Sequence, residues 1–494
     1  MLLKTLLTKT PVQEVIGSAE RDITNIAYDS RRVTPGSLFV ALKGEKQDGA
    51  EFVRDAIDRG AEAVVTDAST SPWKITTIQV PDSRKALADL SCAFYRHPGS
   101  KLKLVGVTGT NGKTTTTYLL KHLLESNGLR SGLLGTVRYE IGRRLLPASR
   151  TTPESLEIND MLYQTLNAGD KAAVMEVSSH ALMQDRVRGL EFDAAIFTNL
   201  TQDHLDYHKT IQAYFEAKAL LFLQLAEQKR KKGVGIINID STHGEQLVTR
   251  FEKELRLVTY GLGVAANYRA TNIRTDGSIT TYQLDADGKS YLVRLPLIGR
   301  FNVYNSLAAL AAARAVGLPL RECVKALASA PQVPGRLEAV PIKRQFQVYV
   351  DYAHTDDALL NVLRTLRELS PSRLIVVFGC GGDRDRAKRP KMGAVATEYA
   401  DYSIVTSDNP RKEDPETIIG EITKAMRPGR FETVLDRQEA IFRAIALAEP
   451  RDIVLIAGKG HETNQEFADH IIPFNDVEMV QNAVDAQPVK MSDS

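Results

Sequence analysis

Short apolar runs alternate with helical patterns from about residue 100 to the end of the chain. The runs are rich in Val and Ile, are bounded by glycine or polar turns, and lie at 102–107, 172–177, 194–198, 233–239, 346–350, 374–378, 403–406 and 452–457. Continuous apolar runs of this length are typical of strands buried on both faces of a parallel sheet. Helical patterns lie between several of them, for example at 155–166, 214–226 and 302–315. The alternation predicts an α/β fold.

The chain is too long for one hydrophobic core. Its 494 residues suggest about three domains. The first hundred residues have shorter strand candidates with Pro and Gly between them, so we place a boundary near Gly99. Pro331 and Pro334 interrupt a helical stretch and suggest a second boundary. We therefore predict domains at 1–99, 100–332 and 333–494, the last two each with its own sheet, and a polar hairpin-like elaboration of the central domain at 267–297.

Charge and cysteine usage narrow the class of protein. The 63 Lys and Arg residues nearly balance the 61 Asp and Glu residues, which argues against bulk nucleic acid as a partner. Cys92, Cys323 and Cys380 are widely spaced, as expected in a reducing compartment. The N-terminal stretch contains Lys4 and Lys9 and no cleavage pattern, and no apolar run approaches the roughly 18 residues of a spanning helix. We expect a cytoplasmic protein with no membrane insertion.

A glycine-rich run at 105–115 indicates phosphate binding. A strand candidate leads into Thr108-Gly-Thr-Asn-Gly-Lys-Thr-Thr115, and a helical pattern follows. Glycines allow backbone N–H groups to approach phosphate oxygens, and the start of a helix favours negative charge. Lys113 can reach the terminal phosphates of ATP, and the Thr114 hydroxyl can ligate Mg²⁺. Val107 stands where the strict phosphate-loop pattern has Gly, but the strand, the helix and Gly-Lys-Thr favour a phosphate loop over a turn that binds nothing.

Two further residues have chemistry suited to a metal site, and one lysine lies in an unusual context. Glu176 and His204 follow strand candidates, at the sheet edge where ligands bind in open α/β folds. Taken singly, each is more often a structural hydrogen-bonding group. Lys218 lies in a helical pattern too apolar for a freely solvated lysine, so it should be paired, snorkelled or chemically modified. The sequence alone favours snorkelling.

Taken together, these motifs resemble the Mur ligase family over nearly the whole chain. The matching runs are Asp29-Ser-Arg31, Gly109-Thr-Asn-Gly-Lys-Thr114, Glu176-Val-Ser-Ser-His180, Asp203-His-Leu-Asp-Tyr-His208, Gly299-Arg-Phe-Asn-Val-Tyr-Asn305, Gly335-Arg336, Asp351-Tyr-Ala-His354, Gly379-Cys-Gly-Gly-Asp-Arg-Asp385, Asp408-Asn-Pro-Arg411 and Gly458-Lys-Gly-His-Glu462. So many motifs in the same order make a chance match unlikely.

The resemblance implies a three-domain ATP-dependent ligase. An N-terminal domain would hold a uridine nucleotide, a central phosphate-loop domain with a parallel sheet would hold ATP, and a Rossmann-like C-terminal domain would hold an amino acid. ATP would convert a carboxylate to an acyl phosphate, which the amino group then attacks. The most similar members add meso-diaminopimelate to UDP-N-acetylmuramoyl-L-alanyl-D-glutamate, a step of peptidoglycan synthesis that supports cell wall biogenesis, cell shape and cell division. The implied cofactors are ATP, Mg²⁺ and a carbamylated Lys218, and we expect a monomer.

The same resemblance assigns residues to each ligand. Nucleotide contacts are implied for Gly109, Thr110, Asn111, Gly112, Lys113, Thr114, Thr115, Asn302, Asn305, Arg336 and Asp351. Metal ligands are implied at Thr114, Glu176, His204 and carbamylated Lys218, the last three counting with Lys113 as catalytic. Contacts to the muramyl substrate are implied for Tyr28, Ser30, Thr151, Thr152, Ser178, Gln184 and Arg186. Contacts to the incoming amino acid are implied for Arg384, Asp408, Asn409, Pro410, Arg411, Gly458 and Glu462.

Arg411 bears on which amino acid is added. Diaminopimelate carries a second carboxylate that lysine lacks, and an arginine fork can bind it. We therefore expect diaminopimelate. The alternatives are the addition of lysine, a folylpolyglutamate-synthetase-like activity and a catalytically silent nucleotide-binding scaffold. The chain departs from the family pattern at Arg150, Asp356 and Asn464; we expect these departures to affect substrate affinity and to remove no implied catalytic group.

Overall fold

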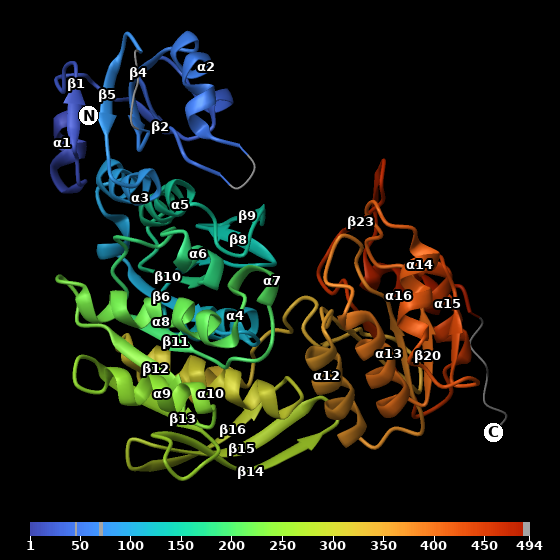
Figure 1. Cartoon of the computed structure of the whole chain (residues 1–494). Coiled ribbons are helices and arrows are strands. Elements are labelled where there is room, and N and C mark those ends of the chain that lie inside the picture. The colour runs from blue at the N-terminus through green and yellow to red at the C-terminus, as the bar shows by residue number, and fades with distance from the viewer. Residues whose placement is uncertain (45–46, 69–72, 488–494) are drawn as a thin grey trace.

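The computed structural model describes residues 1–44, 47–68 and 73–487, and the chain forms three successive α/β units (Figure 1). The N-terminal unit has a five-stranded sheet in the order β1-β5-β4-β3-β2. Its strands are β1 (Glu14–Ile16), β2 (Asn25–Ala27), β3 (Ser37–Val40), β4 (Ala61–Thr66) and β5 (Thr76–Gln79). Its helices are α1 (Leu3–Leu6), α2 (Val53–Asp58) and α3 (Ser83–Phe94), with 3-10 turns at η1 (Leu7–Lys9), η2 (Ser30–Arg32), η3 (Gly49–Phe52) and η4 (Pro98–Ser100).

The central unit is built on an eleven-stranded sheet in the order β16-β15-β14-β13-β12-β11-β6-β10-β7-β8-β9. Its strands are β6 (Lys103–Thr108), β7 (Ser131–Leu134), β8 (Arg138–Ile141), β9 (Arg144–Pro147), β10 (Ala172–Glu176), β11 (Ala194–Phe197), β12 (Val234–Asn238), β13 (Arg256–Gly261), β14 (Tyr268–Asp276), β15 (Ile279–Ala286) and β16 (Lys289–Leu295). The strands from β7 to β14 in this order are parallel, and antiparallel strands extend both edges. The β14–β16 ribbon confirms the hairpin-like elaboration at 267–297.

Helices cover both faces of the central sheet. They are α4 (Lys113–Ser126), α5 (Ser155–Asn167), α6 (Ser179–Met183), α7 (Leu205–His208), α8 (Ile211–Glu227), α9 (Thr242–Phe251), α10 (Arg300–Ala315) and α11 (Leu320–Leu327). The apolar core on one face includes residues of α4, α10 and α11, and the core on the other includes α5, α8 and α9. Helix α8 begins earlier than its apolar pattern because the Thr210 hydroxyl caps it by accepting from the Ala213 N–H at 3.1 Å.

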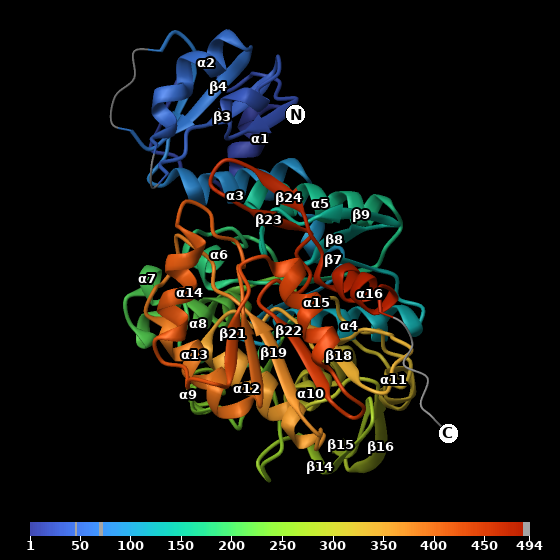
Figure 2. The ribbon, with the colours of Figure 1, turned by 90° about the vertical axis from the view of Figure 1, so that its right-hand side faces the viewer.

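The C-terminal unit has a six-stranded, mostly parallel sheet in the order β17-β18-β22-β19-β20-β21. Its strands are β17 (Glu338–Ala339), β18 (Gln347–Asp351), β19 (Leu374–Phe378), β20 (Tyr402–Val405), β21 (Phe431–Thr433) and β22 (Ile453–Ala457), with a separate ribbon β23 (Asn464–Glu466) and β24 (Ile471–Pro473). Figure 2 shows the sheet between α12 (Asp356–Glu368), α13 (Lys388–Tyr399) and α14 (Pro415–Thr423) on one side, and α15 (Arg437–Leu447) and α16 (Asp476–Asp485) on the other.

The predicted α/β class is confirmed, and all eight predicted strands from residue 102 onward are present with ends shifted by at most a residue or two. The three main sheets use residues 14–79, 103–295 and 338–457. The domain boundaries themselves stay predictions. Within the described ranges, no helix combines the length and apolar character needed to cross a membrane.

Candidate active site

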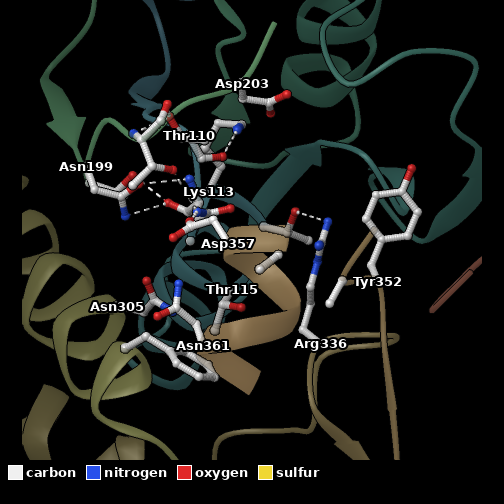
Figure 3. Close-up of a pocket in the computed structure, with 18 of the residues that line it drawn as sticks. Thr110, Lys113, Thr115, Asn199, Asp203, Asn305, Arg336, Tyr352, Asp357 and Asn361 are labelled. Carbon is white, nitrogen blue, oxygen red and sulfur yellow. Dashed lines mark hydrogen bonds between the residues drawn. The ribbon is translucent and has the colours of Figure 1, made fainter. Parts of the chain in front are cut away.

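A cavity of about 510 Å³ is lined by residues of both the central and the C-terminal units (Figure 3). The central sheet contributes the loop after β6 and the ends of β10, β11 and β12, while the C-terminal unit contributes the end of β18 and the start of α12. The predicted residues that line it are Thr110, Asn111, Gly112, Lys113, Thr114, Thr115, Thr151, Glu176, His204, Asn305, Arg336 and Asp351. Most of the predicted nucleotide and metal residues therefore meet at one place.

The loop between β6 and α4 is shaped by two glycines. Gly109 has φ +147° and Gly112 has φ +86°, where L side chains are strained. A Cβ at Gly109 would overlap the Thr198 hydroxyl, and one at Gly112 would overlap the Asn305 side chain. Gly112 is the N-cap of α4 and gives it no side-chain cap, so the first N–H groups of the helix are available to an anion. This geometry fits a nucleotide phosphate.

Two lysine ammonium groups converge on the carbonyl of Gly109. Lys113 Nζ donates to it at 2.9 Å and to the Thr110 carbonyl at 2.8 Å, while Lys218 Nζ donates to it at 2.8 Å. Lys218 is only 1% exposed, and its Nζ lies 4.3 Å from the centre of the Tyr214 ring. The snorkelling interpretation of Lys218 is therefore wrong, because α8 points this side chain into the protein and not along its surface.

Burial lowers the pKa of both lysines, and a neighbouring positive charge lowers each further. Burial lowers the pKa of Lys113, and Glu176 and Asp203 oppose that shift. Burial lowers the pKa of Lys218 well below its ordinary value, and the charge of Lys113 lowers it further. The Lys218 amine is thus shifted toward its neutral, nucleophilic form.

The Glu176 carboxylate is held by Thr136. The Thr136 N–H donates to Oε1 at 2.8 Å, and its hydroxyl donates to Oε2 at 2.9 Å. The Thr136 hydroxyl also lies 3.1 Å from the Thr151 hydroxyl. These contacts orient Glu176 at the end of β10, in the wall of the cavity.

The donor atoms around this cavity suit Mg²⁺ that is shared with phosphates. The Thr114 hydroxyl, the Glu176 carboxylate and the partly exposed His204 ring all line it. Across the residues that the structure describes, no group of three or more His, Cys, Asp or Glu side chains could hold a metal alone. Mg²⁺ is usually bound by one or two carboxylates together with substrate phosphates, so this set fits it. As an ammonium, Lys218 cannot ligate a cation.

Asn302 and Asn305 have different positions on α10. Asn305 lines the cavity, whereas Asn302 is buried and is not among the lining residues. Asn302 Nδ2 donates to the Ile298 carbonyl at 2.8 Å, and Asn302 Oδ1 accepts from Asn305 Nδ2 at 3.0 Å. The structure therefore places Asn302 as the support of Asn305.

The C-terminal unit contributes Arg336 and Asp351 to the cavity. Arg336 Nη2 donates to the Thr114 hydroxyl at 3.2 Å. The Asp351 carboxylate accepts from the N–H groups of Leu337 and Ala353, at 2.6 and 2.7 Å. Burial raises the pKa of Asp351 to about 6. The two units thus meet around Thr114.

Several lining residues were missed by the sequence analysis. Figure 3 shows Asn199, Asp203, Tyr352, Asp357 and Asn361 around the loop. Asn199 Oδ1 accepts from the Asn111 N–H at 2.9 Å, and Asn111 Nδ2 donates to Asp357 at 3.3 Å, which links the loop to α12. Asp203 begins the run that contains His204, and Asn199 lies five residues before His204, directly after a predicted strand, so both could have been indicated by their position. No local pattern indicates that α12 meets the loop.

The predicted muramyl-substrate residues form a second network beside Glu176. The Thr152 hydroxyl donates to the Glu176 carbonyl at 2.9 Å and accepts from the Ser178 N–H at 3.0 Å. Arg186 donates to the Thr152 carbonyl at 2.8 Å and to the Gln184 side chain at 2.6 Å. Tyr28 and Ser30 belong to the N-terminal unit, where the Tyr28 hydroxyl donates across to Glu157 of α5 at 2.7 Å and Ser30 is buried in η2.

The predicted amino-acid residues lie on three loops of the C-terminal unit. Asn409 Nδ2 donates to Glu462 at 2.9 Å. Arg411 donates to Glu466 and to the Gly382 carbonyl, both at 2.9 Å. A Cβ at Gly458 would lie 2.6 Å from an Asp408 carboxylate oxygen, so Gly458 allows the two loops to approach. Pro410 is buried between Asn409 and Arg411, and Arg384 is exposed on the loop after β19.

Lys459 was missed, although it lies within the Gly-Lys-Gly-His-Glu run. Its side chain is fully buried, and Nζ donates to Asn409 Oδ1 at 2.8 Å and to Glu462 Oε2 at 3.0 Å. It thereby joins two loops that each carry a predicted contact to the amino acid. Glu466, which fixes Arg411, was missed as well.

The central unit has a strand, a phosphate loop and a helix within a parallel sheet, and it faces a second α/β unit across a polar cavity. These features define a nucleotide-binding protein of the multidomain α/β class. The family model "Mur ligase middle domain" matches residues 107–313, "Mur ligase, glutamate ligase domain" matches 335–460, and "Mur ligase family, catalytic domain" matches 22–95. The chain belongs to the Mur ligase family.

Individual relatives match this chain over almost its full length. It is 44% identical to the UDP-N-acetylmuramoyl-L-alanyl-D-glutamate--2,6-diaminopimelate ligase of Geobacillus thermodenitrificans, covering 98% of this chain and 99% of that one. It is 42% identical to the enzyme of the same name from Caldanaerobacter subterraneus, covering 96% and 97%. A solved structure of a ligase with this name is 35% identical and superposes with a TM-score of 0.70 over 96% of this chain and 97% of that one.

Proposed function

We propose that this protein is an ATP-dependent ligase that adds meso-diaminopimelate to UDP-N-acetylmuramoyl-L-alanyl-D-glutamate, a step of peptidoglycan precursor synthesis. The observation that carries the proposal is that relatives bearing this activity in their names match the chain at above 40% identity from end to end. The phosphate cavity between two units supports it, because nucleotide and acceptor must meet there. Since the reaction consumes ATP, we propose the cytoplasm as its location, with a monomer as the working unit.

In the proposed reaction, ATP is a co-substrate. A carboxylate oxygen of the acceptor takes the terminal phosphoryl group as the bond to ADP breaks. The amino group then attacks the carbonyl carbon and loses a proton, and phosphate leaves. Lys113 and the first N–H groups of α4 would hold the phosphates, and Arg336 would approach from the C-terminal unit beside Thr114. Positioning and charge neutralisation supply most of the rate in such transfers.

Thr114, Glu176 and His204 would hold Mg²⁺ together with the phosphates. When bound, this ion would neutralise the charge that develops on the transferred group. We further propose that Lys218 is carbamylated, because its pKa is lowered and only the neutral amine adds to CO₂. The product is an anionic carbamate and a proton, so a repelling cation beside Lys113 would become an attracting anion. Removing CO₂ should lower turnover, and bicarbonate should restore it; full activity without CO₂ would contradict the modification.

We propose Arg411 as the residue that selects diaminopimelate over lysine. Its contacts to Glu466 and the Gly382 carbonyl fix the guanidinium plane, as a fork that recognises a carboxylate requires. Asn409 and Glu462 lie on the neighbouring loops and are joined by a hydrogen bond. Such a site suits the distal end of diaminopimelate, which carries both an ammonium and a carboxylate.

The test is phosphate release from ATP in the presence of the UDP-linked dipeptide acceptor. We expect turnover that requires an amino acid and favours diaminopimelate over lysine, and Arg411→Ala should raise KM for diaminopimelate roughly ten- to a hundredfold. Comparable efficiency with lysine would overturn the specificity. Turnover with a folate acceptor in place of the muramyl nucleotide would favour a folylpolyglutamate synthetase, and turnover independent of any amino acid would favour a scaffold.

A further inference from the structure

A fully buried arginine joins two of the loops that carry predicted contacts to the amino acid. Arg389 lies in the first turn of α13, and its side chain is 0% exposed. Its Nη2 donates to the Gly381 carbonyl at 3.3 Å and to Glu413 Oε1 at 2.9 Å, and its Nη1 donates to Glu413 Oε2 at 2.9 Å. Gly381 lies on the loop after β19 and Glu413 on the loop after β20, so one guanidinium group connects both loops.

The Glu413 carboxylate strengthens this connection. Its Oε1 also accepts from the Asp383 N–H at 2.6 Å, and the hydrogen bonds from Arg389 lower the pKa of Glu413. Glu421 of α14 accepts from Arg389 Nη1 at 2.8 Å, and α14 packs against α13. An arginine that meets several acceptors at once is fixed in one orientation, because its donors lie in a rigid plane.

The connected loops also hold Arg411. Its Nη1 donates to the Gly382 carbonyl at 2.9 Å. A Cβ at Gly382 would overlap the Pro410 carbonyl oxygen, so glycine allows the two loops to approach this closely. Gly382 lies between the two residues whose backbone groups accept from Arg389 and donate to Glu413. The pair of Arg389 and Glu413 therefore sets the position of the carbonyl that Arg411 contacts.

The orientation of Arg411 depends on two anchors. One is the Gly382 carbonyl, and the other is the Glu466 carboxylate, which accepts from Arg411 Nε at 2.9 Å. A guanidinium group recognises a carboxylate through two parallel N–H donors, so its plane must point correctly. Displacement of one anchor would turn that plane. Arg389 itself cannot contact a bound amino acid, because its side chain is fully buried.

We propose that Arg389 and Glu413 are positioning residues that orient Arg411 toward the distal carboxylate of diaminopimelate and so contribute to the choice of amino acid. The proposal rests on the proposed ligase function and extends it to two residues that the family resemblance does not assign to a ligand. Lysine has no distal carboxylate. A change in the orientation of Arg411 should therefore weaken the binding of diaminopimelate and leave that of lysine unchanged, whereas loss of a purely structural ion pair should affect both alike.

The test uses Glu413→Gln, which keeps the size of the side chain, removes its charge and presents an NH₂ group to Arg389. In the phosphate-release assay, we expect KM for diaminopimelate to rise roughly tenfold, with kcat and the KM for ATP nearly unchanged. The Ki of lysine as a competitor of diaminopimelate should also stay unchanged, and it reports lysine binding without requiring lysine turnover. Arg389→Met should give the same pattern; if it does not fold, Glu413→Gln alone decides.

A double variant tests whether Glu413 acts through Arg411. In the Arg411→Ala background, Glu413→Gln should cause no further rise in KM for diaminopimelate, because the guanidinium group that it orients is absent. A second rise as large as that in the wild-type background would mean that Glu413 acts by another route, and it would overturn the proposal.

Asp452→Asn is the matched control. Asp452 accepts from Arg373 Nη2 at 2.6 Å and from the Arg373 N–H at 3.0 Å, so it also pairs with an arginine and a backbone donor. This pair lies before β19 and β22, at the opposite end of the parallel strands from the loop that contains Gly382. The control should lower Tm and leave KM for diaminopimelate unchanged.

Two further results would overturn the proposal. Equal losses for diaminopimelate and lysine in Glu413→Gln would mean that the ion pair only stabilises the C-terminal unit. An unchanged KM for diaminopimelate would mean that Arg411 does not depend on the pair. Diaminopimelate-dependent phosphate release by the wild type tests the ligase function separately, because it involves neither variant.

Discussion

The phosphate loop of the central unit and the C-terminal loops that we propose to bind the amino acid, here called the amino-acid loops, are built in different ways. The loop between β6 and α4 depends on backbone: two glycines at positive φ and the uncapped N-terminus of a helix. The amino-acid loops depend on side chains that hold other side chains. Lys459 holds Asn409 and Glu462, and Glu466 holds Arg411. The phosphate loop is one continuous segment, whereas the second site is assembled from three.

This difference matches the two ligands that we propose for these sites. A phosphate presents several equivalent oxygens, and backbone N–H groups at a helix start can bind them without further selectivity. An amino acid must be told apart from others of similar size, which requires charges and donors at fixed distances. Fixing those side chains requires a supporting layer, and Lys459 and Glu466 provide it.

The largest expected effect comes from adding one methyl group to the phosphate loop. Gly109→Ala places a Cβ on the Thr198 hydroxyl at a φ of +147°, so the loop must shift. A displacement of this kind should lower kcat/KM for ATP by about 10²-fold or more, measured as phosphate release. Gly128→Ala is the control, since Gly128 has φ +79° with nothing within 4 Å of an added Cβ. It should cost roughly 1–2 kcal/mol of stability and leave ATP use unchanged. Equal kcat/KM values for ATP in both variants would mean that phosphate binding does not depend on the backbone conformation at Gly109.

A smaller effect is expected when the support of the amino-acid loops is removed. Lys459→Met takes the ammonium from Asn409 and Glu462 and should raise KM for diaminopimelate about tenfold, with KM for ATP nearly unchanged. Lys325→Met is the control, because Lys325 and Glu322 form an ion pair at 3.0 Å with similar sequence spacing but at an exposed site. Steady-state kinetics with each substrate varied in turn provide the measurement. A rise in KM for ATP as large as that for diaminopimelate would contradict separate construction of the two sites.

The smallest expected effect is on the thermal stability of a Lys218 variant. The Lys218 side chain contacts the phosphate loop at the Gly109 carbonyl. Because its folded pKa lies below the unfolded value, the unfolded state binds more protons and stability should rise as pH increases toward 10.5. In CO₂-free buffer at neutral pH, Lys218→Met should therefore raise Tm, by about 2–4 °C for each kcal/mol gained, while activity falls. It should also flatten the rise of Tm with pH.

Lys231 is a comparison for which we expect the opposite change in Tm. It is also largely buried, but its Nζ contacts Asp193 at 2.6 Å. Lys231→Met removes this cation, leaves Asp193 with the more distant and exposed Lys103 at 3.4 Å, and should lower Tm. Thermal unfolding of the two variants across a pH series shows whether Tm rises in one and falls in the other. A lower Tm for Lys218→Met would show that the ammonium stabilises the loop through the Gly109 carbonyl more than its burial costs.

The parts of the site that could be predicted from sequence are those formed within short segments. The residues from Gly109 to Thr115 are adjacent, so the spacing of glycine, lysine and threonine specifies the loop. Asn302 shows the limit of this inference, because the same motif carries one residue to the cavity wall and the other into the core. The two residues lie three positions apart on α10, and only the packing of the helix decides which of them faces the cavity.

The sequence by itself determined the alternation of strands and helices that defines the α/β class, the phosphate loop and the family motifs, because apolar periodicity and glycine spacing act locally. Only the tertiary structure decided which distant side chains meet. Lys218 reaches the carbonyl of Gly109 across 109 residues, Lys459 reaches Asn409 across 50, and Arg84 of the N-terminal unit approaches Glu154 of the central one. Such contacts depend on how helices pack on sheets and how the units dock, and these arrangements are fixed by burial of the whole chain and not by any short pattern.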